Sequence, residues 1–469
     1  MNRNQWTRRG FVKAAGIGTV ALATRGFLSV RRALGQEEPS RKPNVVIIFM
    51  DDQGYQDVGC FGSPHIRTPS LDRMAAEGMK FTDFYAAASV CSPSRAALLT
   101  GCYPPRVGIT KVLFPRDTIG LNPEEATIAD ILKTRGYATA CIGKWHLGHL
   151  PEFLPTSNGF DSYFGVPYSN DMDGIKGKNR SLDRTWQERD YSPWNVPLMR
   201  NEKVVERPAK QTTLIERYTE EAVGFIRKHT SDPFFLYLPH TMPHIPLFVS
   251  DAFHTNDPQK AYQATIEQID WSVGQVLKTL KETGVDDHTL VVFTSDNGPW
   301  LSKKHHAGSA LPLRDGKFST YEGGMREPCI MRWPNRIPAG AVCSEVCGTI
   351  DLLPTIAALA GGRTPKGRVI DGKNIWPLMA GRPGVRSPHS AFYYYQGNTL
   401  QAIREGRWKL RKAKQTELYD LHADIGERRN LAQAHPDIVQ RLTDMMETFD
   451  KNLKTNARPP GRAVTVRNA

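Results

Sequence analysis

The sequence of 469 residues contains no low-complexity tract and no internal repeat. With 40% hydrophobic and 23% charged residues, its composition is ordinary for a soluble globular protein. The sequence also lacks a strong apolar run near its N-terminus, because the run Ala14–Ala23 is too short and too rich in Gly and Ala to span a bilayer. A chain of this length can bury a large core, and we expect two domains.

Acidic residues are absent from positions 1–35, which hold seven basic residues. The net charge of +13 therefore falls to +6 once these seven residues are left out. A balance of this size is compatible with a polyanionic substrate, but it is too weak to indicate nucleic-acid binding.

The basic N-terminus has the pattern of a bacterial export signal over residues 1–35. Thr7–Lys13 is a twin-arginine pattern, and the apolar run follows it. Small residues offer cleavage after Gly35, with an earlier alternative after Ala23, and no cysteine lies nearby to carry a lipid. We expect twin-arginine export of the folded protein to the periplasm or the medium. An uncleaved anchor or a disordered basic tail is the alternative.

Seven cysteines are an odd number. Apart from Cys91 they are Cys60, Cys102, Cys141, Cys329, Cys343 and Cys347. These six could form disulfides in an oxidising compartment, or they could be small core residues. The sequence predicts no particular pairing.

Four continuous apolar runs rich in β-formers predict strands buried on both faces: Val45–Met50, Ala138–Ile142, Phe234–Leu238 and Thr289–Phe293. Helical patterns fall between them at Ser70–Glu77, Thr127–Arg135, Thr213–Lys228 and Gln259–Thr283. This alternation predicts an α/β fold with a large, mostly parallel central sheet flanked by helices. In such sheets ligands bind at the carboxyl ends of the strands.

Two further regions have a different pattern. Asp171–Lys210 is polar and aperiodic, and we interpret it as an insertion of loops with room for a hairpin. Arg382–Pro388 has the composition of a linker and divides a main domain, 36–385, from a small subdomain, 386–469. Short strand patterns and one amphipathic helix, Pro436–Asn452, follow this linker. They predict a small antiparallel sheet covered by that helix.

The segment Cys91-Ser92-Pro93-Ser94-Arg95 places a cysteine at the start of a short helix and an arginine one turn later. Pro93 fits the first turn, and Gly101 can end the helix. The helix dipole favours negative charge at Cys91, and Arg95 lies on the same face. From these residues alone, Cys91 could be a buried structural cysteine or a thiolate nucleophile.

Carboxylates follow two of the predicted parallel strands. Asp51-Asp52 comes directly after Val45–Met50, and Asp296-Asn297 comes directly after Thr289–Ser295. Carboxylates gathered at one sheet edge repel one another, so a cation between them is expected. Oxygen ligands favour Ca²⁺ or Mg²⁺ over zinc. A turn or a helix cap would explain either pair alone, but is a poorer explanation of both.

Basic side chains also follow predicted strands of the sheet. Lys144 and His146 follow the strand that ends at Ile142, and His240 follows Phe234–Leu238. Each histidine alone could be a hydrogen-bonded core residue, but two at strand ends favour a catalytic role. Lys317, in Leu313–Lys317, would by itself be a solvated turn lysine.

These motifs together resemble the type I sulfatase family, in particular its arylsulfatase A-like and N-acetylgalactosamine-6-sulfatase-like members. They are Asp51-Asp52, Cys91–Arg95, Gly143–Gly148, Thr294–Gly298 and Gly316-Lys317 with Glu322–Gly324, in the order typical of that family. Gly165–Ser169 also resembles a segment of arylsulfatase A whose serine lies near the nucleophile. The resemblance implies the alkaline-phosphatase-like fold and an enzyme that releases sulfate from sulfate esters.

The resemblance also implies cofactors. Cys91 would be oxidised by a formylglycine-generating maturation enzyme to 3-oxoalanine (Cα-formylglycine), whose hydrate is the nucleophile. One Ca²⁺, rather than Mg²⁺, would be held by Asp51, Asp52, the modified Cys91, Asp296 and Asn297. Conversion before folding agrees with export of the folded protein.

The remaining roles follow from the same resemblance. Arg95 and Lys144 would hold the hydrate, with Ser169 close to it. His240 and Lys317 would face the bridging oxygen, and His146 would take a proton from the second hydroxyl so that sulfate is eliminated. Asp315 stands where many relatives have glycine, which bears on the approach of Lys317.

Two alternative functions remain at this point. One is a phosphatase or phosphodiesterase of the alkaline-phosphatase superfamily, although such enzymes usually bind two metals through several histidines. The other is a non-catalytic protein that binds sulfated glycans with an unmodified Cys91. We expect a sulfated carbohydrate or an aryl sulfate as substrate. The expected recognition loops are Met172–Lys210 and Trp300–Arg314, and the second contains a basic cluster, Lys303, Lys304, His305 and His306.

Overall fold

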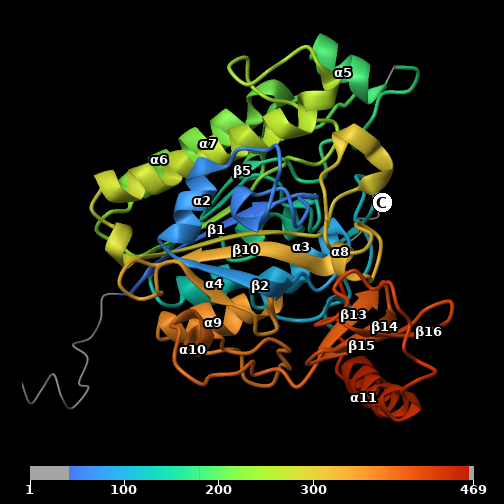
Figure 1. The fold of residues 1–469 in the computed structure, drawn as a ribbon. Coiled ribbons are helices and arrows are strands. Elements are labelled where there is room, and N and C mark those ends of the chain that lie inside the picture. Colours follow the sequence, from blue (N-terminus) through green and yellow to red (C-terminus); the bar gives the residue numbers. More distant parts are fainter. Residues whose placement is uncertain (1–41, 179, 464–469) are drawn as a thin grey trace, which may run out of the picture. The chain divides into compact units, whose positions relative to one another are not determined.

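A computed structural model of the protein describes residues 42–178 and 180–463 (Figure 1). The expected signal peptide over residues 1–35 lies outside the described residues. From Pro43 onward the fold is built on an 11-stranded sheet with the order β11-β2-β10-β9-β1-β8-β4-β5-β6-β7, and β12 pairs with β2.

The four strands predicted from apolar runs form the centre of this sheet. They are β1 (Asn44–Met50), β4 (Ala138–Ile142), β8 (Phe234–Pro239) and β9 (Thr289–Ser295). β1 pairs in parallel with β8 and β9, β8 pairs in parallel with β4, and β4 with β5 (Ser162–Gly165). The prediction of a large, mostly parallel sheet is confirmed.

Two long strands, β10 and β2, were not predicted from the sequence. β10 (Arg326–Arg332) runs antiparallel between β9 and β2 (Met79–Tyr85). It begins Arg326-Glu327-Pro328, so it offers no continuous apolar run. The register shifts between Glu327 and Cys329, which places Pro328 at an irregularity where a missing N–H is tolerated. Short β11 (Ala341–Cys343) and β12 (Cys347–Gly348) then pair with β2 in parallel.

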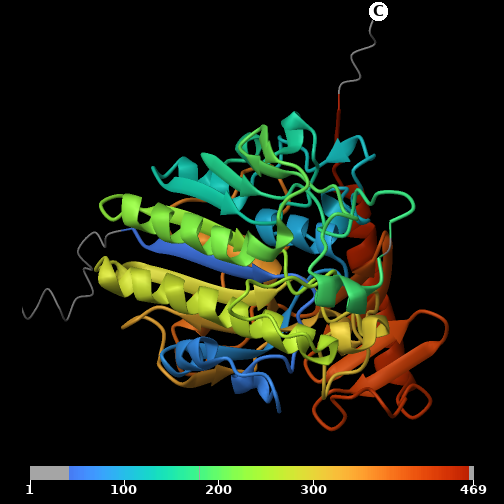
Figure 2. The ribbon, with the colours of Figure 1, turned by 90° about the horizontal axis from the view of Figure 1, so that it is seen from above.

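Helices cover both faces of the sheet (Figures 1 and 2). One face carries α2 (Pro69–Ala76), α6 (Leu214–Lys228) and α7 (Ala261–Glu282); the other carries α3 (Cys91–Thr100), α4 (Ile128–Lys133) and α9 (Leu352–Leu359), with short α10 (Trp376–Met379) nearby. Val46 and Ile48 of β1 join the core beneath the first group, whereas Val45 and Ile47 join the core beneath the second. This alternation is that of a strand buried on both faces.

Short 3-10 helices lie in the connections: η1 (Gly59–Phe61), η2 (Pro104–Arg106), η3 (Pro151–Phe153), η4 (Pro155–Ser157), η5 (Gln211–Thr213), η6 (Pro258–Lys260), η7 (Asp286–His288), η8 (Leu301–His306) and η9 (Thr349–Asp351). The insertion between β5 and α6 contains α5 (Leu182–Glu188) and an antiparallel hairpin of β6 (Leu198–Arg200) and β7 (Lys203–Glu206). This hairpin extends the edge of the large sheet beyond β5.

The C-terminal part forms the predicted small antiparallel sheet. Its strands are β13 (Phe392–Gln396), β14 (Thr399–Glu405), β15 (Trp408–Lys412) and β16 (Thr416–Asp420), and α11 (Pro436–Thr455) covers them. Leu442 and Met446 of α11 share a core with Ile403 and Leu410 of the sheet. Near the end of the described chain, β17 (Gly461–Arg462) pairs with β3 (Ile119–Gly120). The domain boundary at 385 stays a prediction.

All seven cysteines are free. Cys329 and Cys343 stand opposite Phe81 on the two sides of β2, so two strand spacings, about 10 Å, separate their Cα atoms. A disulfide spans at most about 7 Å between Cα atoms, which excludes that bridge in this fold. No helix within residues 42–178 and 180–463 is long and apolar enough to cross a lipid bilayer.

Candidate active site

The carboxyl ends of β1 and β9 bring four predicted residues together. Met50 and Ser295 are register partners in parallel strands, so Asp51-Asp52 and Asp296-Asn297 leave the sheet side by side. The Asp296 N–H donates to the Met50 carbonyl over 3.1 Å, and the Asp52 N–H donates to Asp296 Oδ1 over 3.1 Å. The four residues form the floor of a strand-end cluster that is at most 3% exposed.

Helix α3 adds Cys91 and Arg95 to this cluster. Cys91 is the first helical residue, and Gly101, at φ +68°, ends the helix by donating its N–H to the Ala97 carbonyl. The Arg95 guanidinium is fully buried; Nη2 donates to Asp296 Oδ2 over 2.8 Å and lies 3.5 Å from Asp51 Oδ1. The arginine is therefore an internal cation that faces the carboxylates.

The end of β4 supplies Lys144. Its Nζ donates to Asp51 Oδ2 over 2.5 Å and to Ser169 Oγ over 3.1 Å. The preceding Gly143 has φ +131°, and a Cβ there would lie 1.8 Å from the Pro239 carbonyl oxygen. Only glycine permits this close approach of the β4 end to the β8 end, and it aims Lys144 at Asp51.

Lys317 reaches the cluster from the loop before α8 (Glu322–Met325). Its Nζ lies 2.7 Å from Asp52 and 3.6 Å from Cys91 Sγ. Asp315 adopts φ +63°, a conformation that glycine takes more readily, and its Oδ1 accepts the Gly316 N–H over 2.9 Å. The aspartate at this position is therefore accommodated, and Lys317 still reaches Cys91.

Three carboxylates and three cations in the cluster pair one to one: Asp51 with Lys144, Asp52 with Lys317, and Asp296 with Arg95. Burial by itself would raise the pKa of Asp51, but Lys144 and the other cations hold this pKa well below its usual range. Burial, followed by the charge of Asp51, raises the pKa of Asp296 to about 7. The paired charges show that a metal is not needed merely to cancel repulsion.

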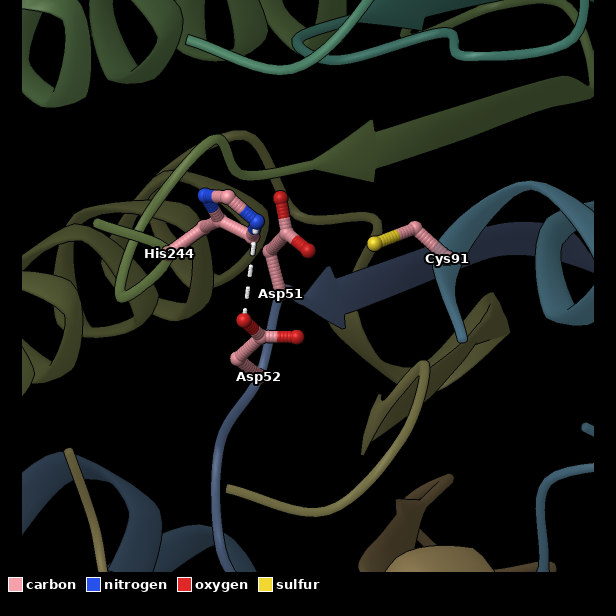
Figure 3. Close-up of side chains that lie close together, drawn as sticks. All are labelled: Asp51, Asp52, Cys91 and His244. Atoms are coloured by element: carbon pink, nitrogen blue, oxygen red, sulfur yellow. Dashed lines mark ion pairs between the residues drawn. The ribbon is translucent and has the colours of Figure 1, made fainter. Parts of the chain in front are cut away.

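Orphaned oxygens provide the better test of a metal site. Asp51 Oδ1 and Asn297 Oδ1 are buried without a hydrogen-bond partner in the described part of the chain. The Asn297 amide nitrogen donates to Asp52 Oδ1 over 2.7 Å, so its own oxygen remains available. Figure 3 shows Asp51, Asp52, Cys91 and His244 lying together. One ligand atom of each lies within 4.8 Å of the others. Free buried oxygens of this kind fit a hard cation such as Ca²⁺.

His146 lies beside this cluster. Its Nε2 lies 2.9 Å from the Leu113 carbonyl, and the Leu113 N–H donates to Ser92 Oγ in α3 over 3.1 Å. Its Nδ1 is buried and has no hydrogen-bond partner among the described residues. Burial, then the charge of Lys144, holds the pKa of His146 well below its usual value, so the imidazole is neutral near pH 7. A neutral nitrogen with a free lone pair can accept a proton.

The structure corrects the prediction for His240. Its Nε2 lies 3.3 Å from Ser272 Oγ of α7, and its ring lies near Tyr218 of α6. Leu236 and Leu238 point to this same helical layer, and His240 continues their alternation by two residues. Burial alone lowers the pKa of His240 to about 3, with no contribution from the cluster charges. His240 is a neutral core residue outside the strand-end cluster.

His244 occupies the place that was expected for His240. Its Nε2 lies 3.6 Å from Asp52 Oδ2, and its ring nitrogens lie 3.3 Å and 3.4 Å from Ser169 Oγ. Burial, then Lys317, lowers the pKa of His244. The sequence contained a signal against His240, because strand alternation after Leu238 directs it to the helices, but the position of His244 beside Asp52 depends on the folded loop.

The Cys91 environment bears on the thiolate interpretation. The residue is 1% exposed, and burial raises the pKa of its thiol to about 12 even though Lys144 and Lys317 act in the opposite direction. A thiol with this pKa is almost entirely protonated near pH 7. Burial of Cys91 therefore disfavours an unmodified thiolate nucleophile.

Aromatic side chains border the cluster on the side of Lys317. The Trp300 ring centroid lies 5.7 Å from that of His244 and 4.6 Å from Lys317 Nζ. Phe318 packs edge-on against Trp300 at 5.5 Å and is 46% exposed. This pair forms a partly exposed apolar wall directly beside the cluster. Trp300 begins one of the expected recognition loops, Trp300–Arg314, whereas Phe318 lies beyond it and was not predicted.

Comparison with known families matches nearly the whole described chain. The model of the family described as Sulfatase matches residues 43–362. The model described as N-sulphoglucosamine sulphohydrolase, C-terminal, matches residues 314–452.

Comparison with individual proteins gives long matches. The chain is 39% identical over 411 residues to N-acetylgalactosamine-6-sulfatase of Sus scrofa, covering 84% of this chain and 76% of that protein. It is 36% identical over 446 residues to arylsulfatase A of Homo sapiens, covering 87% of each. Among solved structures, Ps i-CgsB in complex with k-i-k-neocarrahexaose superposes with a TM-score of 0.77 at 32% identity, over 90% of this chain and 95% of that one.

Proposed function

Because the chain belongs to the sulfatase family and is a sulfatase enzyme, we propose that it hydrolyses sulfate esters of carbohydrates through a formylglycine formed from Cys91 and one bound Ca²⁺. One observation carries this proposal. The cysteine of the C-x-P-x-R segment lies at the start of α3, against a buried cluster in which two oxygens remain without partners.

The residues that would hold the metal are Asp51, Asp52, Asp296 and Asn297, together with the oxygen of the modified Cys91. Bound there, Ca²⁺ would supply positive charge that polarises the sulfate group, and the aldehyde hydrate would supply the attacking oxygen. The two free oxygens, Asp51 Oδ1 and Asn297 Oδ1, support this assignment.

The three buried cations would bind and orient the anionic groups. Arg95 is held by Asp296, and Lys144 by Asp51, so both present fixed positive charge next to Cys91. Lys317 Nζ lies 3.6 Å from Cys91 Sγ and would bind a substrate oxygen. Fixed charges that need no rearrangement stabilise the charge that develops in the transition state.

Two neutral imidazoles would contact the reacting groups. His146 presents a free Nδ1 and would accept a proton from the hydrate hydroxyl when sulfate leaves. His244, positioned by Ser169 and Asp52, would hydrogen-bond to the departing alcohol oxygen, and the ammonium group of Lys317 beside it would supply the proton. This assignment replaces His240 of the sequence analysis.

The wall formed by Trp300 and Phe318 supports a carbohydrate as the leaving group. Aromatic faces pack against the apolar C–H face of a sugar ring, and this wall stands beside Lys317, where the departing oxygen would lie. Sugar-related names among the relatives, including N-acetylgalactosamine-6-sulfatase, agree with this class. We expect a Trp300→Ala variant to raise KM for a sulfated oligosaccharide more than for a small aryl sulfate. An equal change on both substrates would contradict this role.

The decisive test combines peptide mass with sulfate release. The full chain is produced together with a formylglycine-generating enzyme, and the Cys91 peptide is examined for loss of sulfur and gain of oxygen. Converted, Ca²⁺-loaded protein is expected to release sulfate, and Cys91→Ala protein is not. Failure of converted protein on a broad panel of sulfate esters, combined with turnover of phosphate esters, would favour the phosphatase alternative.

We also propose twin-arginine export to the periplasm or the medium, on the basis of the N-terminal pattern alone. The expected result is that Arg8→Lys with Arg9→Lys retains the full-length protein in the cytoplasm, while the unaltered chain is exported. Export of both proteins would contradict this route.

A further inference from the structure

A second group of metal-binding side chains lies outside the strand-end cluster. Asp183 Oδ1 lies 2.7 Å from His305 Nε2 and 2.7 Å from His306 Nε2. The three ligand atoms all lie within 4.8 Å of one another. Two imidazole nitrogens and a carboxylate oxygen thus converge on one point.

This convergence joins two segments that are far apart in sequence. Asp183 lies in the first turn of α5, the helix labelled in Figure 1 that belongs to the insertion after β5. The two histidines end η8. Consecutive residues of a 3-10 helix point about 120° apart, so adjacent histidines do not normally share a partner. Lys304, at φ 56° and ψ −123°, breaks the helix, and the two imidazole centroids come to lie 4.5 Å apart.

The surroundings leave one side of this group open. The His306 side chain is 4% exposed and His305 is 24% exposed, whereas Asp183 is 51% exposed. A metal could therefore enter from the Asp183 side and keep a water molecule as a further ligand. Buried imidazoles with an open fourth position are a common arrangement for divalent transition metals.

We propose that Asp183, His305 and His306 form a site for a divalent transition metal of the zinc class, separate from the strand-end cluster. Imidazole nitrogens favour Zn²⁺, Co²⁺ or Ni²⁺ over Ca²⁺, which takes oxygen ligands. In the metal-free arrangement one carboxylate oxygen lies within hydrogen-bonding distance of both Nε2 atoms. On binding, each Nε2 lone pair turns to the metal and the ring proton resides on Nδ1.

The site would fasten α5 to the segment that begins at Trp300. Trp300 is the residue that precedes η8, and Lys303 Nζ lies 4.2 Å over its ring. A metal at the end of η8 would therefore fix the aromatic wall relative to the insertion that carries α5. This inference does not depend on the chemistry of Cys91.

The test is a metal titration of the full chain, saturated with Ca²⁺ and carrying Cys91→Ala so that no thiol is present in the strand-end cluster. Zn²⁺ binding is measured by calorimetry, and Co²⁺ binding by its visible absorption, which reports nitrogen and oxygen ligands. We expect one saturable equivalent. His306→Gln, His305→Gln and Asp183→Asn should each weaken it by at least about tenfold.

His254→Gln is the matched control. His254 Nε2 lies 3.0 Å from the Trp186 carbonyl of the same helix α5, but it is not part of the group. This variant should bind the metal like the parent, and the metal should raise the melting temperature of both, but not that of His306→Gln. Absence of saturable binding by the parent, or equal binding by the His306→Gln variant, would overturn the proposal.

Discussion

Two buried charge clusters of this protein can be compared directly. The strand-end cluster surrounds Cys91, and a second cluster, the junction network, connects α8 with the small C-terminal sheet. In the junction network Glu322 accepts from Tyr85 over 2.6 Å, and from Tyr394 and Lys409 over 2.9 Å each. Lys409 also pairs with Glu427 at 2.8 Å. Both clusters exclude solvent almost completely.

The two clusters differ in how their oxygens are used, although Glu427 Oε1 of the junction network also has no hydrogen bond and is held by its ion pair with Lys409 at 2.8 Å. Both oxygens of Glu322 accept from protein donors, and Lys409, followed by Arg404, holds its pKa well below the usual range despite burial. In the strand-end cluster, Asp51 Oδ1 and Asn297 Oδ1 lack a hydrogen-bond partner in the described chain. A buried oxygen without a donor costs free energy unless a ligand supplies the partner. The comparison therefore separates a network that stabilises the fold from one that prepares a binding site.

The largest expected effect tests which histidine belongs to the strand-end cluster. We expect His244→Ala to reduce kcat/KM for sulfate release by about 10²–10⁴-fold, because it removes a group expected to hydrogen-bond to the leaving oxygen as negative charge develops there. His240→Gln should retain kcat within a few-fold, because His240 contacts Ser272 and not the cluster. Steady-state kinetics with an aryl sulfate measures both variants. The opposite ranking would restore His240 to the catalytic set.

A second prediction concerns the free oxygens themselves. Asn297→Ala removes one of them together with an amide that donates to Asp52. Ca²⁺ affinity is expected to fall by about 10–100-fold, and activity at limiting Ca²⁺ should fall with it. Calorimetric titration with Ca²⁺ measures the loss. Asn170→Ala, a buried asparagine that bonds Gln211 outside the cluster, serves as control and should leave Ca²⁺ affinity unchanged.

A third prediction concerns the junction network. Glu322→Gln leaves Lys409, Arg404 and Arg326 without their shared carboxylate, and we expect the free energy of unfolding to fall by about 3–5 kcal/mol. Activity per folded molecule should change little, because Glu322 does not contact the strand-end cluster. Denaturant unfolding and kinetics on the same sample check both statements. A large loss of kcat with unchanged stability would erase the distinction between the clusters.

The smallest expected effect is a pH dependence. Burial lowers the pKa of His240 from 6.5 to about 3, so the unfolded chain binds a proton that the folded chain does not. The stability contributed by the neutral ring is present above pH 6.5 and is lost as the pH falls below that value. His240 alone can make the free energy of unfolding fall by at most about 1.4 kcal/mol for each pH unit. His146 and His244 also have lowered pKa values and contribute to the same window, so His240→Gln should reduce the slope between pH 6.5 and 4.5 by the His240 share, as measured by denaturant unfolding.

The same argument separates Glu322 from His240. The pKa of Glu322 is depressed below 4.5, so its contribution is present above pH 4.5 and is lost only as the pH falls further. Above pH 4.5, protonation of Glu322 therefore does not contribute to the change in the free energy of unfolding. An identical pH slope in parent and His240→Gln protein would contradict a neutral buried His240.

Much of the fold followed from local pattern. The four apolar runs gave the central strands, because a strand buried on both faces needs a continuous apolar sequence. β10 was missed because its burial depends on neighbours: Arg326 is buried between Asp83 and Glu322, which come from distant positions. Charged residues of this kind form a buried strand only when partners arrive from elsewhere in the chain.

The sequence by itself determined which residues stand at the ends of β1 and β9 and at the start of α3, since a residue that follows a strand or begins a helix is placed by the chain itself. Only the tertiary structure decided that His244 rather than His240 faces Asp52, that each carboxylate has its own cation, and that Asp183 meets His305 and His306. The physical reason is that the first set depends on neighbouring residues and the second on contacts between distant parts of the chain. Side-chain direction along a strand repeats every two residues, whereas a contact between loops depends on how the whole chain packs.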